Sequence, residues 1–93
     1  MFQVEYQPEA VAELNRLRAF DRARILDAIE RHLTEAPAAV GGSKKRLDLG
    51  SGNVIHQLRV GEYRIFYDVD EAERHVIVRH VRRKGQKTTG EIL

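Results

Sequence analysis

Residues 58–70, with the sequence LRVGEYRIFYDVD, decide the fold of this 93-residue chain. Two runs of strand-forming residues flank a tight connection at Gly61, a pattern typical of a β-hairpin. Successive side chains of a strand point to opposite faces, so the second run has one apolar and aromatic face, made of Tyr63, Ile65, Tyr67 and Val69. The same alternation places Arg59 and Arg64 together on the opposite face. A guanidinium presents a planar fork of donors that matches a phosphate, so this second face predicts a phosphate-binding surface.

The N-terminal half predicts a strand followed by two helices. Apolar residues alternate with polar ones from Phe2 to Tyr6, which indicates a short strand. Pro8 is placed to open a helix, because its fixed φ and missing N–H are tolerated in the first turn. The apolar stripe of this helix consists of Val11, Leu14 and Leu17. Asp21 suits the N-cap of a second helix. The buried face of that helix is expected to comprise Ile25, Leu26, Ile29 and Leu33.

The C-terminal half predicts three strands, at residues 54–60, 63–70 and 75–82. Short turns join them, so neighbouring strands are expected to pair antiparallel. The basic segment at residues 44–46 is expected to be a loop. The chain therefore predicts a single α+β domain over residues 1–93 with the order β-α-α-β-β-β. In it a helical hairpin packs on one face of a small twisted antiparallel β-sheet, and the other face is left open for a ligand.

The composition narrows the class of protein. Hydrophobic residues make up 42% and charged residues 32% of the chain, as in soluble globular proteins. No run approaches the roughly 18 apolar residues that a membrane-spanning helix needs, and the start, MFQVEYQPEA, lacks the pattern of a signal peptide. There is no cysteine, so disulfides and thiolate metal sites are excluded. We therefore expect a cytoplasmic protein that does not bind membranes.

The net charge of +2 is unevenly distributed. Residues 1–40 carry five basic and seven acidic side chains, whereas residues 41–93 carry eleven basic and seven acidic ones. The excess comes from two groups, residues 44–46 and a C-terminal set made of Arg79, Arg82, Arg83, Lys84 and Lys87. Such patches attract polyanions, although solvated surface charge is the simpler interpretation of either group alone.

With this hairpin at its centre, the chain resembles the RelE/ParE superfamily of toxins from bacterial type II toxin–antitoxin pairs. The resemblance begins with VEYQPEAVAELNRL, continues through DRARILDAIERHL and KKRLDL, and is most specific at LRVGEYR and at the ending VIVRHVRRK. It implies a cytoplasmic toxin that a cognate antitoxin holds inactive, often as a toxin–antitoxin heterotetramer, and it implies no cofactor. RelE-like members cleave mRNA in the ribosomal A site, and ParE-like members poison DNA gyrase. The shared scaffold does not choose between them.

The resemblance also implies roles for individual residues. Arg64 matches the arginine of the GxYR segment, which contacts the scissile phosphate in RNases of this type, and Arg59 matches the basic residue before the turn. Arg83 and Lys84 are the nearest counterparts of the basic cluster that ends the family's last strand.

Two departures from the family pattern concern catalysis. Many active RelE-like RNases carry a tyrosine shortly after the last basic cluster, but in this chain no tyrosine follows Tyr67. Ile55 and Gln57 stand where the family has lysines before the hairpin. The catalytic set is therefore incomplete by the best-known pattern.

Histidine is the remaining candidate for proton transfer, because its ordinary pKa lies near 6.5. His80 lies beside the basic cluster and, by simple alternation, in phase with Val76 and Val78. His56 is expected to pack within the sheet instead. The histidines are scattered, without the close spacing of metal ligands, so we expect no metal site.

The sequence thus predicts two sets of site residues. The catalytic set is Arg64, Arg83, Lys84 and His80. The set expected to bind RNA or the ribosome is Lys44, Lys45, Arg46, Arg59, Arg82 and Lys87. The leading hypothesis is a metal-independent, ribosome-dependent mRNA endonuclease that inhibits translation, with mRNA, the ribosome and an antitoxin as partners. The alternatives are a ParE-like toxin that binds gyrase without catalysis of its own, and a degenerate toxin retained to bind its antitoxin and regulate its operator.

Overall fold

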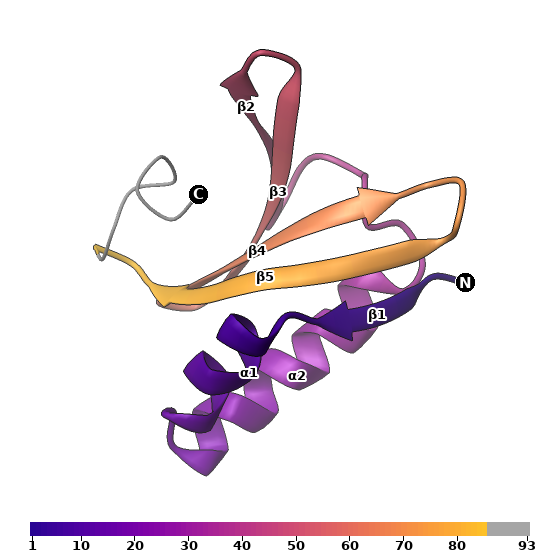
Figure 1. Cartoon of the computed structure of the whole chain (residues 1–93). Coiled ribbons are helices and arrows are strands. Elements are labelled where there is room, and N and C mark those ends of the chain that lie inside the picture. The colour runs from indigo at the N-terminus through magenta and orange to yellow at the C-terminus, as the bar shows by residue number, and fades with distance from the viewer. Residues whose placement is uncertain (86–93) are drawn as a thin grey trace.

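The computed structural model describes residues 1–85. In chain order the elements are β1 (Gln3–Tyr6), α1 (Pro8–Asn15), α2 (Ala19–Leu33), β2 (Lys44–Gly50), β3 (Asn53–Val60), β4 (Tyr63–Asp70) and β5 (His75–Arg83). Both helices lie on one side of the sheet (Figure 1). The predicted α+β fold, a helical hairpin on one face of a small sheet, is therefore confirmed.

The sheet has five strands in the order β1-β5-β4-β3-β2. The strands from β2 to β5 pair antiparallel, as their short connections predict. β1 joins the outer edge of β5 in a parallel pairing, so the sheet is mixed rather than wholly antiparallel. The sequence prediction also missed β2, because residues 44–46 were expected to form a loop. β2 instead pairs with β3, and this hairpin projects from the body of the sheet (Figure 1).

The helices begin close to the predicted positions. Pro8 occupies the first turn of α1, as expected. The second helix begins at Ala19, so Arg18 and not Asp21 is its N-cap. Asp21 lies in the first turn of α2, where its negative charge interacts favourably with the positive end of the helix dipole. Its carboxylate also accepts a hydrogen bond of 3.2 Å from the hydroxyl of Tyr63, which fixes the start of α2 to the sheet.

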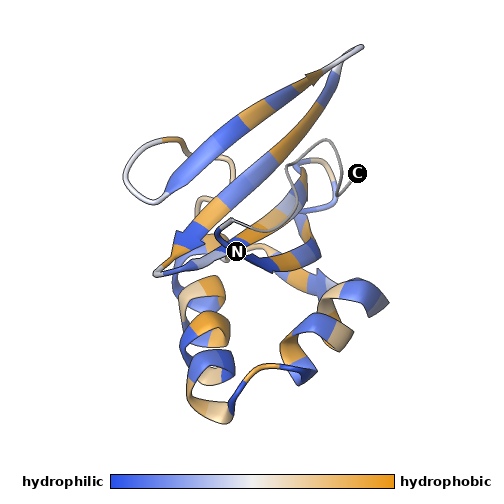
Figure 2. Ribbon diagram, turned by 90° about the vertical axis from the view of Figure 1, so that its left-hand side faces the viewer, coloured by the Kyte–Doolittle hydropathy of each residue, from blue (hydrophilic) through white to orange (hydrophobic). Residues whose placement is uncertain are grey.

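The core lies between the helices and the sheet. Its largest fully buried side chains on that side are Ile25, Ile29, Leu33, Leu58, Ile65, Tyr67, Val76 and Val78. Figure 2 shows the alternation of apolar and polar residues along the strands that produces this face. Val11 and Leu26, which the sequence placed on the buried stripes, are 43% and 38% exposed. In the described part of the chain, neither helix is long and apolar enough to span a membrane.

An extra residue in β5 changes which side chains share a face. Phe66 pairs with His80, but Tyr67 pairs with Val78, so Arg79 is bulged out of the ladder. The alternation restarts after the bulge, and Val81 joins Val78 on the helix side of the sheet. His80 therefore lies on the face without helices, and its predicted phase with Val78 is wrong. We call this second face, opposite the helices, the helix-free face.

Candidate phosphate-binding site

Arg59 and Arg64 are directly opposite each other in the ladder between β3 and β4, which confirms that they share the helix-free face. They border a shallow cavity of about 120 Å³. Its lining residues are Gly42, Ser43, Lys44, Lys45, Gln57, Arg59 and Arg64. We call this the basic cavity. Two guanidinium groups and an ammonium group around one small cavity form a site suited to a phosphate.

The turn beside Arg64 holds its guanidinium in place. Nη1 of Arg64 donates hydrogen bonds of 3.0 Å to the carbonyl oxygens of Gly61 and Tyr63. Gly61 has a φ of +56°, a left-handed conformation that favours glycine, and a Cβ there would collide with the guanidinium of Arg24. The tight turn therefore fixes the arginine before any ligand arrives, which lowers the entropy that binding costs.

The three basic residues at the start of β2 have different environments. Lys44 donates hydrogen bonds from Nζ to the carbonyl oxygens of His32 (3.2 Å), in the last turn of α2, and of Ala36 (2.8 Å), in the connection that follows. The carbonyl of His32 lacks an intrahelical partner, so Lys44 satisfies the end of the helix. Arg46 pairs with His56 and shares the face of Lys44. Of the predicted basic trio, Lys45 is the residue whose strand position faces the basic cavity.

A buried glutamate holds the two polar residues of β5 that follow the bulge. The carboxylate of Glu13, on α1, is 10% exposed. Its Oε1 accepts a hydrogen bond of 2.7 Å from the backbone N–H of Val81. Its Oε2 lies 3.1 Å from Nε of Arg82, as an ion pair without hydrogen-bond alignment, and 3.4 Å from Nδ1 of His80. Arg82 lies directly opposite Arg64, so this Glu13 cluster (Glu13, His80 and Arg82) adjoins the predicted site.

Arg83 lies on the other face of the sheet. It pairs with Tyr63 in the ladder, its guanidinium is 5.6 Å from the centre of the Tyr63 ring, and Nη2 donates a 3.4 Å hydrogen bond to the hydroxyl. This hydrogen bond raises the pKa of Arg83. The prediction that Arg83 joins Arg64 on one face is therefore wrong, and Arg82 has that position. Lys84 is exposed next to it, and Lys87 lies outside the described residues.

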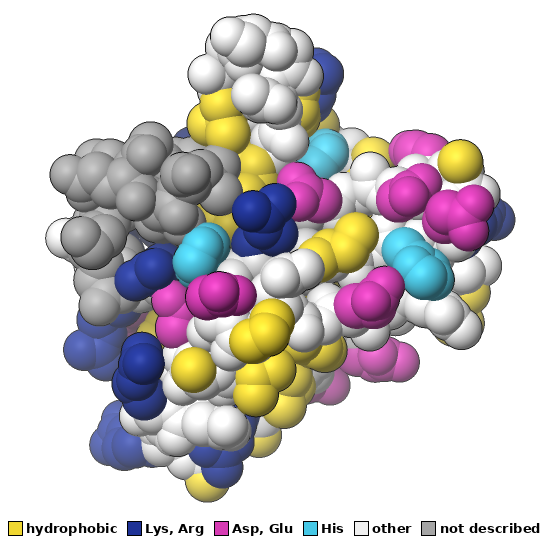
Figure 3. Space-filling model, viewed as in Figure 1, with side chains coloured by type: hydrophobic (Ala, Val, Ile, Leu, Met, Phe, Trp, Pro, Cys, Tyr) yellow, Lys and Arg dark blue, Asp and Glu magenta, His cyan; other side chains and the backbone are white. Residues whose placement is uncertain are grey.

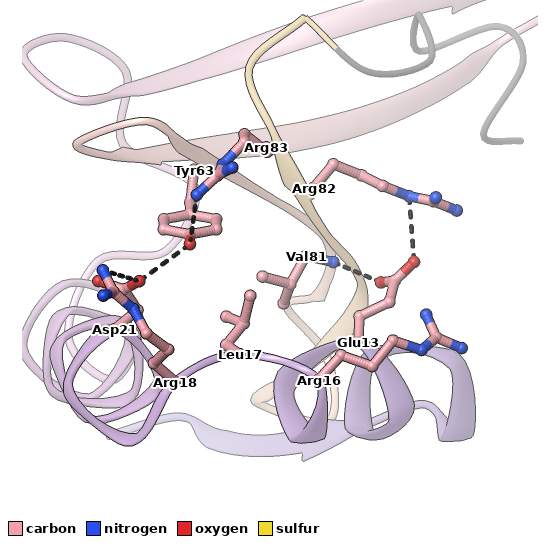
Figure 4. A pocket seen from close by; sticks show the side chains of 9 residues that line it. All are labelled: Glu13, Arg16, Leu17, Arg18, Asp21, Tyr63, Val81, Arg82 and Arg83. Carbon is pink, nitrogen blue, oxygen red and sulfur yellow. Dashed lines mark hydrogen bonds and ion pairs between the residues drawn. The ribbon is translucent and has the colours of Figure 1, made fainter.

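Arg83 borders a larger cavity, of about 320 Å³, between the α1–α2 connection and the end of β5 (Figure 4). Its lining residues are Glu13, Arg16, Leu17, Arg18, Asp21, Tyr63, Val81, Arg82 and Arg83. Basic side chains gather over this end of the molecule (Figure 3). The carboxylates of Glu13 and Asp21 are already paired with β5 and Tyr63, so this cavity is less basic than its four arginines suggest.

His56 has a structural environment, as the sequence predicted. Its ring stacks on that of Tyr67, with the centroids 5.4 Å apart. Burial lowers the pKa of His56, and the positive charge of Arg46 lowers it further. The hydroxyl of Tyr67 donates a buried hydrogen bond of 2.7 Å to the carbonyl oxygen of Pro37. Burial raises the pKa of Tyr67, so this phenol stays neutral and serves packing.

Sequence reasoning missed Glu13, although a signal was present. Glu13 lies on the buried side of α1 with Ala10 and Leu14, at positions where an amphipathic helix carries apolar residues. A carboxylate at such a position indicates a buried partner.

The fold is that of several solved structures of RelE toxins. The archaeal RelE of the RelE–RelB complex from Pyrococcus horikoshii is 20% identical, with a TM-score of 0.67 over 92% of this chain and 98% of that one. The RelBE2 toxin–antitoxin complex from Mycobacterium tuberculosis contains a chain that is 20% identical, with a TM-score of 0.70 over 89% and 98%. The isolated Escherichia coli RelE toxin is 15% identical, with a TM-score of 0.64 over 98% and 93%.

Residues 4–87 match the family described as the ParE toxin of the type II toxin-antitoxin system parDE. The chain belongs to this family, within the RelE/ParE superfamily, and is the toxin of a type II toxin–antitoxin system. No curated protein matches it significantly. Several of the similar structures are complexes of a toxin with its antitoxin.

Proposed function

We propose that this toxin is a metal-independent, ribosome-dependent endoribonuclease that cleaves mRNA and so inhibits translation in the cytoplasm. The observation that supports this proposal best is the shared face of Arg59, Arg64 and Arg82. Arg59 and Arg64 border the basic cavity, and Arg82 lies opposite Arg64 in the ladder. Several of the structures with the same fold carry the RelE name, in agreement with the proposal.

The reaction consists of one displacement at phosphorus. The 2′-oxygen of a ribose attacks the adjacent phosphate, and the bond from phosphorus to the 5′-oxygen of the next nucleotide breaks. The products are a 2′,3′-cyclic phosphate and a free 5′-hydroxyl. A base takes the proton of the 2′-hydroxyl, and an acid gives a proton to the leaving 5′-oxygen.

The residues of the helix-free face can be assigned to these steps. Arg64 and Arg59 bind the phosphate and stabilise the extra negative charge of the phosphorane. Arg82 lies opposite Arg64 and adds a third cation. Arginine stays protonated and cannot be the base, so His80 carries a proton in one of the two transfers. Lys45 contacts the RNA backbone, a contact that gives affinity without sequence preference.

The second candidate function is a gyrase-binding toxin that breaks no bond itself. Two observations favour it. The matching family is named for ParE, and the sequence lacks both the tyrosine and the strand lysines of the best-known RNase pattern.

Two assays on the purified toxin separate the candidates. In the first, ribosomes stalled on a defined message are mixed with the toxin, and primer extension maps cuts in the A site. In the second, gyrase is mixed with supercoiled DNA and the toxin, and trapped cleavage complexes are counted as linear DNA. The endoribonuclease proposal expects A-site cuts and no linear DNA. Linear DNA with intact mRNA would overturn it in favour of gyrase.

A further inference from the structure

The two carboxylate oxygens of Glu13 make different kinds of contact. β1 pairs with β5 only as far as Tyr6 and Val78, so no strand of the described residues lies beside the edge of β5 beyond Val78. Oε1 of Glu13 takes the place of the missing strand by accepting the N–H of Val81. An unpaired buried N–H is costly, and this contact is therefore a structural one. A neutral amide oxygen could accept that hydrogen bond equally well.

The second oxygen of Glu13, Oε2, contacts side chains and not the backbone. Oε2 faces His80 and Arg82, which are both on the helix-free face that carries Arg64. The side chain of His80 is 13% exposed and that of Arg82 is 24% exposed, so water screens these contacts only in part. Burying a full negative charge is expensive unless cations or donors face it. The carboxylate at this position therefore indicates a function for Oε2.

A carboxylate can only accept hydrogen bonds, so the imidazole nitrogen that faces it carries the proton. Nδ1 of His80 is that nitrogen. Nη2 of Arg82 also lies 3.4 Å from Nδ1 and could donate to it only if Nδ1 carried no proton. The buried carboxylate needs a donor, whereas the more exposed guanidinium of Arg82 can bond to water, so the geometry favours the Nδ1–H form. The other charged side chains near this part of β5 include Arg64 on β4 and the ion pair between Arg79 and Asp68, with 2.7 Å between Nη1 and Oδ2. Arg16 and Arg83 line the cavity beside Glu13 (Figure 4).

From this geometry we infer that Glu13 is a positioning residue of the site, which holds His80 with its proton on Nδ1 and holds Arg82 beside Arg64. Nε2 is then the nitrogen that exchanges a proton with the RNA. This inference rests on the proposed endoribonuclease function for its consequence, but the state of the histidine can be measured without any substrate.

The chain contains a matched control. Glu5 on β1 and His75 on β5 form a second pair, with Oε2 and Nδ1 3.0 Å apart, in which the side chains are 58% and 35% exposed. The substitutions Glu13→Gln and Glu5→Gln thus remove the same charge from the same kind of pair, once beside the predicted site and once away from it. Glu13→Gln keeps an oxygen for the N–H of Val81, and a melting curve of each variant verifies the fold.

The first experiment records the ring nitrogens of ¹⁵N-histidine-labelled toxin by long-range ¹H–¹⁵N correlation. The expected result is the Nδ1–H form of His80 in the wild type and in Glu5→Gln, and its loss in Glu13→Gln. A wild-type protein in which Nδ1 of His80 carries no proton would overturn the inference without any variant. His80 signals in Glu13→Gln that equal those of the wild type would also overturn the inference.

The second experiment measures single-turnover cleavage on stalled ribosomes. Glu13→Gln is expected to lower the rate at saturating toxin roughly ten- to hundredfold, by analogy with the loss of a partner that orients a metal-binding histidine. The toxin concentration that gives half of the maximal rate should stay the same, and Glu5→Gln should cleave like the wild type. Glu13→Gln should lower the rate by a smaller factor in a His80→Ala background than in the wild type, because only the positioning of Arg82 is then left to lose. The same factor in both backgrounds, or a full rate in Glu13→Gln, would overturn the inference. A wild-type toxin with the expected His80 signals but no cleavage would refute the proposed function and leave the positioning of His80 intact.

Discussion

The two faces of this sheet are built from the same strands but differ in composition, although Phe66 on the helix-free side is also buried. On the helix side of β4, Ile65 and Tyr67 are fully buried in the core. On the helix-free side of the same strand, Arg64 borders the basic cavity. Because neighbours in a strand point to opposite faces, Ile65 contributes to the core, whereas Arg64 contributes to the proposed function. Substitutions at adjacent positions should therefore affect different properties.

The largest expected effect is on the core face. Ile65→Ala removes a fully buried side chain between β3 and β5 and leaves a cavity, which costs about 2–5 kcal/mol of unfolding free energy. Urea unfolding of the purified toxin measures this loss. Arg64→Ala, one residue earlier, should lower the unfolding free energy by less than about 1 kcal/mol, as is usual away from the core. Equal losses of unfolding free energy in the two variants would show that the two faces do not differ in their contribution to stability.

The next largest effect is a difference in cleavage rate between substitutions of two neighbouring arginines at the end of β5. Arg82→Ala should lower the rate of A-site cleavage about tenfold or more, because it removes a cation opposite Arg64. Arg83→Ala should leave the rate nearly unchanged, since the Arg83 guanidinium lies over Tyr63 on the other face. Single-turnover cleavage at saturating toxin measures both. A larger loss in Arg83→Ala would restore the assignment that the sequence alone suggested.

The smallest expected effect concerns pH and His56. Burial lowers the pKa of His56 in the folded toxin below the ordinary value of 6.5 that applies in the unfolded chain. The unfolded state therefore binds more protons between these two pKa values, and stability falls as the pH drops below about 6.5. His56→Phe retains an aromatic ring to stack on Tyr67 and should remove this part of the slope. Unfolding free energies of both proteins from pH 5 to pH 8 measure it, and identical slopes would contradict this role of burial.

The sequence predicted the features that depend on strict alternation and helical spacing. The shared face of Arg59 and Arg64, the burial of Tyr67 and the start of α1 at Pro8 all follow from local patterns. β2 was missed because its pairing with β3 stabilises a segment whose own residues are mostly charged or exposed.

The part of the site on β5 could not be predicted because it depends on tertiary structure. The bulge at Arg79 exchanges the faces of the following residues, so Arg82 and not Arg83 lies opposite Arg64. The buried environment of Glu13 arises where β1 ends and α1 takes its place beside β5. Neither event has a local sequence pattern of its own, although a glutamate on the apolar side of α1 gives an indirect signal.

The most direct test of the proposed function is the rate at which Arg64→Ala cleaves mRNA on stalled ribosomes. Arg31→Ala is the matched control, since Arg31 is an exposed arginine of α2 that pairs with Asp27. A hundredfold or greater loss in Arg64→Ala, equivalent to about 3 kcal/mol of transition-state stabilisation, with full activity in Arg31→Ala, is the predicted result. A folded Arg64→Ala that cleaves as fast as the wild type would contradict the assignment of the helix-free face as the site of RNA cleavage.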